Sequence, residues 1–467
     1  MEPVKYLLSR SRQGSALVLS LIFVVMFSAM AVALASMSGT NVQIAENQRK
    51  LDTTRGCAES GLEVLRYWMS RVEMSGTTAP GQRFAQLATV LQSDLLAAGI
   101  TNLVLACDGS TINISSVTLQ SSNNQNFTAV FTKIDNDNDN VRLDVTGHYG
   151  PISRTIRTNY RFDRRAHNVF DYGVASKGPL SLSGNVELDG VNINVESNAY
   201  IESANSLLAL SIIGNSQIAG HVKIVNPLAD VYLQGGHAGI GGVTGEAATL
   251  PPYTEIGVGA TEFPEMNPAL FYSYATNVLS PTADLSHDAT YENLRIPAST
   301  NPSFSGHATL RGIIYVETPN VVTFSGGVNI TGIIVSNGSP TDDSGTSQIS
   351  FAGNVTSYPI DQLPQETKFQ GLHTQTGTFM MTPGFRARFG GSFSSLSGAI
   401  AANGIEFYGN AGGTINGSIL NYSNAAMTLS GNSDLLFNRS GLTEVPAGFV
   451  PEIVMHYDPS AYSEVVL

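Results

Sequence analysis

The sequence has little charge and almost no cysteine. Charged residues make up 13% of its 467 positions, against about 25% in an ordinary soluble domain. Ser, Thr, Asn and Gly take their place, a composition common in exposed β-rich proteins. The net charge of −13 argues against nucleic acid as a partner. Two cysteines, Cys57 and Cys107, are too few for a disulfide framework or a cysteine-based metal site; in an exported protein they either form one bridge or stay free.

Groups that carry chemistry are also missing from the sequence. The eight histidines are scattered without metal-ligand spacing, and no G-x-S-x-G nucleophile motif occurs. Polysaccharide-degrading enzymes need grouped carboxylates with a basic residue nearby, but Asp342 and Asp343 lie in a Ser/Gly loop, and Glu187 and Asp189 have no spaced counterparts. The single tryptophan, Trp68, removes the commonest stacking platform for sugars. The sequence therefore predicts no enzyme, no metal and no cofactor.

One long apolar run stands near the N-terminus. Residues Ala16 to Met37 are apolar or small, and no charge occurs between Arg12 and Glu46. As a helix, these residues span ~33 Å, which matches a bilayer core of ~30 Å. A buried soluble helix would rarely be this long and apolar all round, and the run is too long for a cleaved signal sequence. The run predicts a transmembrane helix.

The helix is expected to continue beyond the membrane. From Leu51 to Val72, apolar or small residues recur every three or four positions and form one stripe. Gly56 and Gly61 interrupt this segment, each at a cost of about 1 kcal/mol relative to alanine. The stripe predicts packing on the chain's own globular domain, and packing on a neighbouring subunit's helix is the alternative.

The two ends of this helix carry a family resemblance. The segment Arg12–Val18 reads RQGSALV before the apolar run, and Cys57–Leu62 reads CAESGL after it. Over roughly the first seventy residues, the chain resembles PilX-type pilus assembly proteins and minor pilins. The resemblance implies that prepilin peptidase cuts between Gly14 and Ser15. Here the chain departs from major pilins, which carry Phe or Met after the cut and Glu four residues later, where this chain has Ser15 and Leu19.

The resemblance also implies the partners and the place of the protein. Other pilin-like subunits and the peptidase are the expected partners. The helix is expected in the inner membrane, with the remainder outside as a periplasmic or extracellular region. Basic residues flank the apolar run on both sides, so charge alone does not orient the helix.

The next segment predicts a small sheet. Residues 126–162 contain three strand-like stretches that suggest an antiparallel meander, and a helix followed by such a sheet is the pilin-like order. The run Asp135–Asn140 is expected to be a solvated hairpin turn, with Ca²⁺ binding through its oxygens as the alternative.

Glycine marks the rest of the chain. Ten glycines lie in residues 1–166 and thirty-six in residues 167–467. A local unit recurs in which Gly184, Gly214 and Gly326 are each followed by a second Gly six positions later. Glycine turns the chain where φ is positive, and stacked coils bury a continuous interior. The pattern predicts a β-helix, with a β-sandwich as the alternative fold.

These observations define an expected organisation. We expect a leader (1–14), a transmembrane and extended helix (15–75), a pilin-like α+β head (76–166), and a Gly-rich β-helix-like domain (167–467) with an irregular Pro-rich insertion near 244–305. The expected function is that of a minor pilin-like structural or assembly component of a type IV pilus or related pseudopilus, low in copy and located at the tip. A membrane-tethered adhesin whose surface ligand is unknown is the alternative, and a tethered polysaccharide-active enzyme is a third.

Overall fold

The computed structural model describes residues 13–121, 124–134, 139–439 and 445–465. The chain forms two compact units. Unit 1 comprises residues 1–74, 78–163 and 454–467, and unit 2 comprises residues 75–77 and 164–453. The chain thus leaves unit 1 for most of its length and returns to it at the end.

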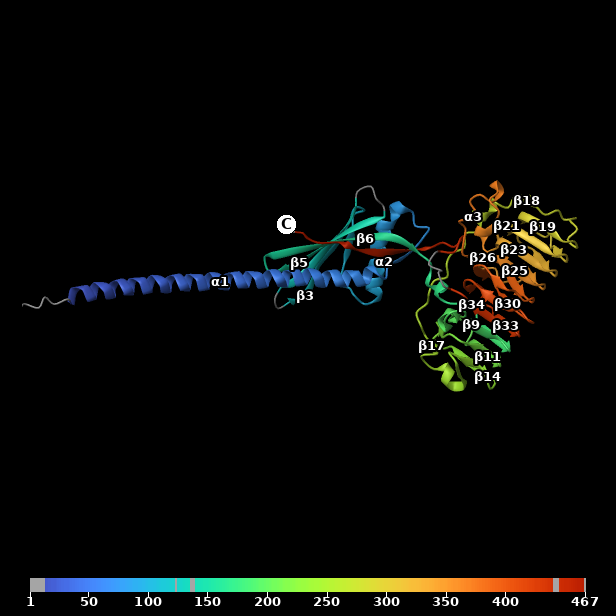
Figure 1. Ribbon diagram of the computed structural model, residues 1–467, viewed down its shortest axis with the longest axis horizontal. Coiled ribbons are helices and arrows are strands. Elements are labelled where there is room, and N and C mark those ends of the chain that lie inside the picture. The colour runs from blue at the N-terminus through green and yellow to red at the C-terminus, as the bar shows by residue number, and fades with distance from the viewer. Residues whose placement is uncertain (1–12, 122–123, 135–138, 440–444, 466–467) are drawn as a thin grey trace, which may run out of the picture. The chain divides into compact units, whose positions relative to one another are not determined.

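Unit 1 begins with the helix α1 (Gln13–Met69), 57 residues long and therefore about 85 Å in length. Its side chains are exposed all round from Ala16 to Arg49. From Thr54 onward the helix packs on the sheet of unit 1 (Figure 1), where it contacts two central strands, β4 (Gln125–Lys133) and β5 (Asn140–Tyr149). The expected long apolar helix is confirmed, and so is packing of the apolar stripe on the chain's own domain.

The sheet of unit 1 has seven strands in the order β1-β35-β6-β5-β4-β3-β2. The expected meander over residues 126–162 is present, because β4, β5 and β6 pair antiparallel in succession. Along β5, side chains alternate between buried and half-buried positions, as expected of a strand with one face on a core. Residues 135–138 of the Asp/Asn run lie outside the described part of the chain. The strands are β1 (Glu73–Ser75), β2 (Leu105–Cys107), β3 (Thr111–Gln120), β4 (Gln125–Lys133), β5 (Asn140–Tyr149), β6 (Ile152–Arg165) and β35 (Glu452–Val465).

Strands β1, β2 and β3 of unit 1 were not predicted, and neither were one helix and the last strand. Helix α2 (Pro80–Ala97) begins with a proline at its first position, where the missing N–H costs nothing, and it buries Phe84, Leu87 and Leu91 on one face. The last strand is β35, which was missed because the sequence analysis placed residues 454–467 with the Gly-rich region. That assignment differs from the structure because a strand pattern shows which residues alternate but not which distant strand they pair with.

Unit 2 contains three sheets whose strands pair in parallel, except for β15 with β16. The largest sheet holds β7 (Val174–Ser176), β10 (Ala199–Ile201), β13 (Val222–Ile224), β17 (Thr254–Ile256), β18 (Asn277–Val278), β19 (Ala289–Ile296), β21 (Ala308–Val316), β23 (Val328–Ser336), β25 (Val355–Tyr358), β26 (Thr378–Thr382), β29 (Ala399–Ala402) and β32 (Ile419–Asn421). The second sheet holds β8 (Leu180–Gly184), β11 (Leu208–Gly214), β14 (Asp230–Gln234), β20 (Ser303–Phe304), β22 (Val321–Phe324), β24 (Gln348–Phe351), β27 (Arg386–Phe389), β30 (Ile405–Phe407) and β33 (Met427–Gly431). The third holds β9 (Glu187–Gly190), β12 (Gln217–Ile218), β15 (Gly239–Ile240), β16 (Val243–Thr244), β28 (Ser395–Leu396), β31 (Gly413–Ile415) and β34 (Leu435–Phe437).

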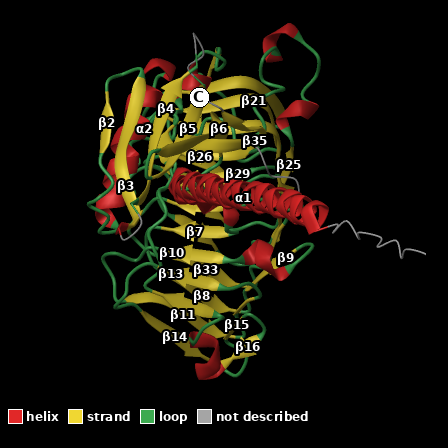
Figure 2. Ribbon diagram, turned by 90° about the vertical axis from the view of Figure 1, so that its left-hand side faces the viewer, coloured by secondary structure: helices red, strands yellow, loops and turns green. Residues whose placement is uncertain are grey.

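The chain starts in the middle of the stack. It passes through the three sheets in rotation from β7 to β17 and again from β26 to β34, but from β18 to β25 it visits only the first two sheets. From β7, β8 and β9 it advances outward to β17, and residues 257–276 then lead to β18 at the opposite edge of the largest sheet. From there, successive coils return to the middle, where β32, β33 and β34 pair in parallel with β7, β8 and β9. Figure 2 shows β33, β8, β11 and β14 as successive rungs. The expected insertion at 244–305 is only partly irregular, because β18, β19 and β20 from its second half join the sheets.

A column of glycines stands at the end of the second sheet. Gly184 lies opposite both Gly214 and Gly431, all three with positive φ. A Cβ on Gly184 would lie 2.5 Å from the Gly431 carbonyl oxygen. Gly326 belongs to the same column without a positive φ, since its Cβ would lie 2.3 Å from the Gly306 oxygen. The predicted equivalence of these turn glycines is confirmed, and the reason is both conformation and the close approach of the next coil.

The interior of unit 2 is apolar along its whole length. Five phenylalanines stack on successive coils of the second sheet, with neighbouring ring centroids 4.8–5.2 Å apart; they are Phe304, Phe324, Phe351, Phe389 and Phe407. Beyond this stack the column continues through Leu429 and Leu182. Much of the largest sheet is buried on both faces, because a second core that includes Phe263, Phe271 and Phe369 covers part of its outer side.

Candidate assembly helix and outer surface of unit 2

The exposed part of α1 is the first candidate functional surface. It is a helix long and apolar enough to cross a membrane, and the apolar window is not buried at all. Leu19 is 55% exposed, although leucine normally lies inside a protein. The first ion pair after the apolar run joins Lys50 Nζ to Glu46 Oε1 at 2.8 Å. An apolar surface of this extent requires a partner, either lipid or protein.

The remainder of α1 lies unusually close to its sheet. A Cβ on Gly147 of β5 would be 2.2 Å from the Thr54 carbonyl oxygen and 2.4 Å from the Ala58 nitrogen. Thr54 and Ala58 are themselves fully buried, and the Thr54 hydroxyl donates to the Lys50 carbonyl at 2.6 Å. Glycine is therefore required at position 147, because any side chain there would push the helix away from the sheet.

Gly61 has the same role on the helix side. A Cβ on Gly61 would lie 2.6 Å from the Phe127 ring on β4 and 2.9 Å from a methyl group of Val145. Gly56 differs, since its Cβ would meet nothing within 4 Å. In the sequence both glycines are simply residues that weaken a helix. The structure shows that only Gly61 is needed for packing against the sheet.

The expected processing site lies at the beginning of the helix. Gly14 and Ser15 belong to its first turn, and the structure does not describe their side chains. Cleavage between them stays a prediction.

Comparison with known families decides the type of this helix. A family model described as PilX N-terminal matches residues 13–63. The N-terminal region of this chain is therefore PilX-type. The matched segment covers the exposed part of α1 and the first turns that pack on the sheet.

Solved structures and curated proteins add little to this PilX-type assignment. The structure of the competence-associated pilin ComZ from Thermus thermophilus is 12% identical to the chain, and the match covers 89% of this chain and 97% of that one, with a TM-score of 0.26. A search of curated proteins finds no match.

The two cysteines differ in their surroundings. Cys57 is buried on the sheet-facing side of the PilX-type helix, and Cys107 is exposed on β2. Both thiols are free in the structure, and burial raises the pKa of the Cys57 thiol. A bridge between them stays a prediction.

A buried carboxylate stands where the chain enters and leaves unit 2. Glu452, 4% exposed, accepts a hydrogen bond from Arg165 Nη2 at 2.8 Å, and His167 Nδ1 lies 2.9 Å from its other oxygen. Burial opposes the ionisation of Glu452, but the hydrogen bonds from His167 and Arg165 outweigh it and lower its pKa. Sequence reasoning missed this cluster because its members are nearly 290 positions apart.

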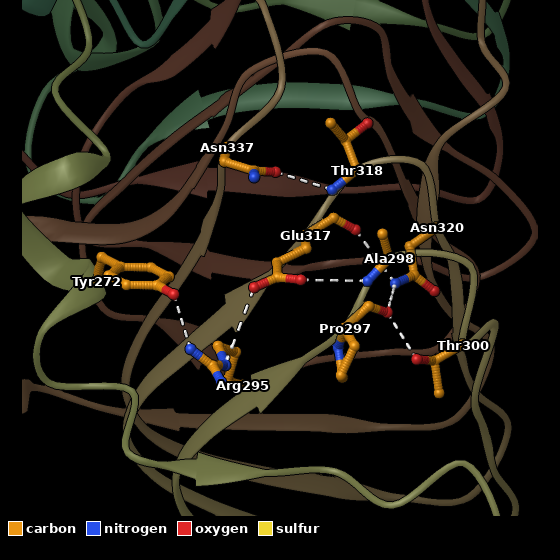
Figure 3. A network of polar contacts seen from close by, with 9 residues as sticks. All are labelled: Tyr272, Arg295, Pro297, Ala298, Thr300, Glu317, Thr318, Asn320 and Asn337. Carbon is orange, nitrogen blue, oxygen red and sulfur yellow. Dashed lines mark hydrogen bonds and ion pairs between the residues drawn. The ribbon is translucent and has the colours of Figure 1, made fainter.

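The outer surface of unit 2 is the second candidate. Many of its polar groups serve to join one coil to the next. In Figure 3 the Ala298 N–H donates to Glu317 Oε2 at 3.3 Å, and the Thr318 N–H donates to Asn337 Oδ1 at 2.8 Å. Arg295 Nη1 donates to the Tyr272 hydroxyl at 2.7 Å. The first two of these contacts satisfy backbone N–H groups at the turns.

Side chains of the metal-ligating types do not gather within the described residues. No group of three or more His, Cys, Asp or Glu side chains among them could hold a metal ion. Outward charges on the second sheet pair with each other, as Arg388 does with Glu406 at 2.7 Å. Glu187 and Asp189 lie on β9, but Asp342 and Asp343 do not join them in a cluster.

Proposed function

We propose that the chain is a minor pilin-like structural or assembly component of a type IV pilus or related pseudopilus. Helix α1 anchors it in the inner membrane, and unit 2 is displayed on the exterior side. The observation that carries the proposal is the fully exposed apolar half of a PilX-type helix. Each large apolar side chain gains about 1.5–3 kcal/mol when it is removed from water, so this half of α1 is stable only in lipid or against other helices.

Unit 2, the displayed region, is suited to presenting a rigid surface. We infer that residues 174–437 form a β-helix built in two halves, because the chain returns repeatedly to parallel sheets, three in most coils and two between β18 and β25, around one continuous apolar interior. A rigid stack of this kind holds its outer side chains in register over many coils. Partners of the helix are other pilin-like subunits, and prepilin peptidase processes it between Gly14 and Ser15.

Leu19 supports a low-copy position at a fibre tip. In pilins, the Glu shortly after the cut is thought to pair with the N-terminal amine of a neighbouring subunit. A carboxylate in the bilayer costs at least about 2.5 kcal/mol, so it persists where a partner offsets that cost. Leu19 needs no such partner and cannot make that repeated contact, which suits a subunit that lacks one neighbour.

Mass spectrometry of the mature N-terminus tests the proposal. We expect the wild-type protein to begin at Ser15 and the Gly14→Ala variant to keep the leader. Gold-labelled antibody against unit 2 should mark fibre ends or the cell envelope. A single unprocessed wild-type species would favour the alternative, a membrane-tethered adhesin, and regular labelling along the shaft would contradict the tip position.

A further inference from the structure

The Gly-Asn pairs of unit 2 do more than turn the chain. Their asparagines form a row across successive coils: Asn215 donates to Asn185 at 3.0 Å, Asn185 to Asn432 at 3.0 Å, and Asn432 to Asn410 at 3.4 Å. These side chains are exposed. A carboxamide has two N–H donors and two acceptor sites. Each inner member of the row therefore keeps one donor and one acceptor for another molecule.

A second polar row runs beside the first. Glu187 on β9 lies opposite Gln217 on β12. On the opposite side of β9, Asp434 precedes β34, and its Oδ1 accepts a hydrogen bond from the Glu187 N–H at 3.2 Å. Glycine bounds the row at both ends, with Gly239 opposite Gln217 and Gly412 beside Asp434. The row is thus three side chains long on three adjacent coils, which are spaced by about 4.8 Å.

A hollow of about 290 Å³ lies along these two rows. Its lining consists of three asparagines, one glutamine and two carboxylates, together with Val186, whose side chain is buried. The wall that faces solvent is therefore almost wholly polar. The second half of the chain contributes Asn432 and Asp434, and the first half contributes the others, so the hollow exists only because the two halves meet in the middle.

Two polar side chains of the hollow are not used in hydrogen bonds that hold the fold together. Across the structurally described chain, the Glu187 carboxylate and the Gln217 amide have no hydrogen-bond or ion-pair partner. Some other outward charges of unit 2 do have one, such as Glu292 with Lys368 at 2.7 Å. Polar groups that are left open and gathered in a concavity on a rigid frame are available to a ligand.

We propose that this hollow binds a neutral saccharide. Sugar hydroxyls both donate and accept, so they match carboxylates, which only accept, and carboxamides, which do both. A peptide that binds by strand addition or by apolar anchors would need an open strand edge or apolar pockets, and the hollow offers neither. An acidic polymer is disfavoured because residues 164–453 contain twenty-two Asp and Glu but only ten Lys and Arg. The absence of an aromatic platform in the lining points to weak binding of a single saccharide unit.

The proposal deepens the proposed function, since it names what the displayed region recognises. The test uses the full-length protein in detergent micelles on an array of neutral α-glucans, β-glucans, mannans and chitooligosaccharides, followed by calorimetric titration with the best of them. We expect at least one saccharide to bind and its Kd to rise tenfold or more in the double variant Glu187→Gln/Gln217→Ala. The control is Ser181→Ala/Thr428→Ala, an adjacent pair on the outer face of the second sheet, which should leave the Kd unchanged.

Three results would overturn the proposal. One is the absence of any bound saccharide, and another is an equal Kd in wild type and the double variant at equal melting temperature. The third is a response to Ca²⁺ alone that Glu187→Gln abolishes, because the two carboxylates would then form a cation site. Cleavage at Gly14 is measured separately, so an unprocessed protein that binds the saccharide would end the pilin proposal and not this one.

Discussion

The two units use glycine for the same physical purpose in two kinds of packing. In unit 1, Gly61 and Gly147 let a helix lie against a sheet at a distance that no side chain would permit. In unit 2, Gly184 and Gly214 let one coil follow the next while the chain turns with positive φ. Only the second use repeats along the chain, and so only the second was visible in the sequence. The comparison shows that glycines in a sequence reveal close backbone packing only where that packing repeats at a regular spacing.

The sharpest test breaks the coil contact. Gly214→Val places a β-branched residue at φ +89°, with its Cβ 2.6 Å from the Gly184 carbonyl oxygen. We expect a loss of about 2–4 kcal/mol in unfolding free energy, from backbone strain and overpacking together, measured by thermal or chemical denaturation. Gly236→Val is the matched control, because a Cβ there meets nothing within 4 Å. Equal stability of the two variants would show that the column is not needed.

The corresponding test in unit 1 compares two glycines on one helix. Gly61→Ala should lower stability by about 1–3 kcal/mol because the new methyl group meets the Phe127 ring. Gly56→Ala should be neutral or raise stability by up to about 1 kcal/mol through helix propensity. Denaturation of the full-length protein in micelles measures both. If Gly61→Ala were stabilising, the helix would have room to move and the close contact would not be essential.

The smallest effect on stability is expected at Glu452, where the chain enters and leaves unit 2. The pKa of Glu452 is lowered in the folded state, so its stabilising contribution is present above its unfolded pKa of about 4.3 and disappears as pH falls through the lower folded value. Wild type should therefore lose more stability between pH 5 and lower pH than Glu452→Gln does. Arg165 and His167 are the charged and titratable groups in contact with it. Parallel pH dependences of the two proteins would mean that the ion pair contributes nothing.

Sequence patterns were sufficient for the local features of the candidate sites. The apolar run, the stripe on α1 and the strand alternation in residues 126–162 follow from the periods of helices and strands, which adjacent residues set among themselves. The Gly-Asn units follow from the φ that a turn demands. The resemblance of the first seventy residues to PilX-type proteins likewise rests on neighbouring residues, and the family match over residues 13–63 agrees with it.

What the tertiary structure alone decided are the long-range pairings. Strand β35 joins the sheet of unit 1, and the last coil of unit 2 pairs with the first, because parallel coils present the same backbone groups wherever they lie in the chain. In the sequence, no second carboxylate recurs at a regular spacing from Glu187. In the structure its backbone N–H donates to Asp434, 247 positions away, since the chain enters unit 2 in the middle of the stack and its last coil returns there from the opposite edge. Residue type and spacing determine how each coil forms, but the free energy of burying the coil faces determines which coils become neighbours.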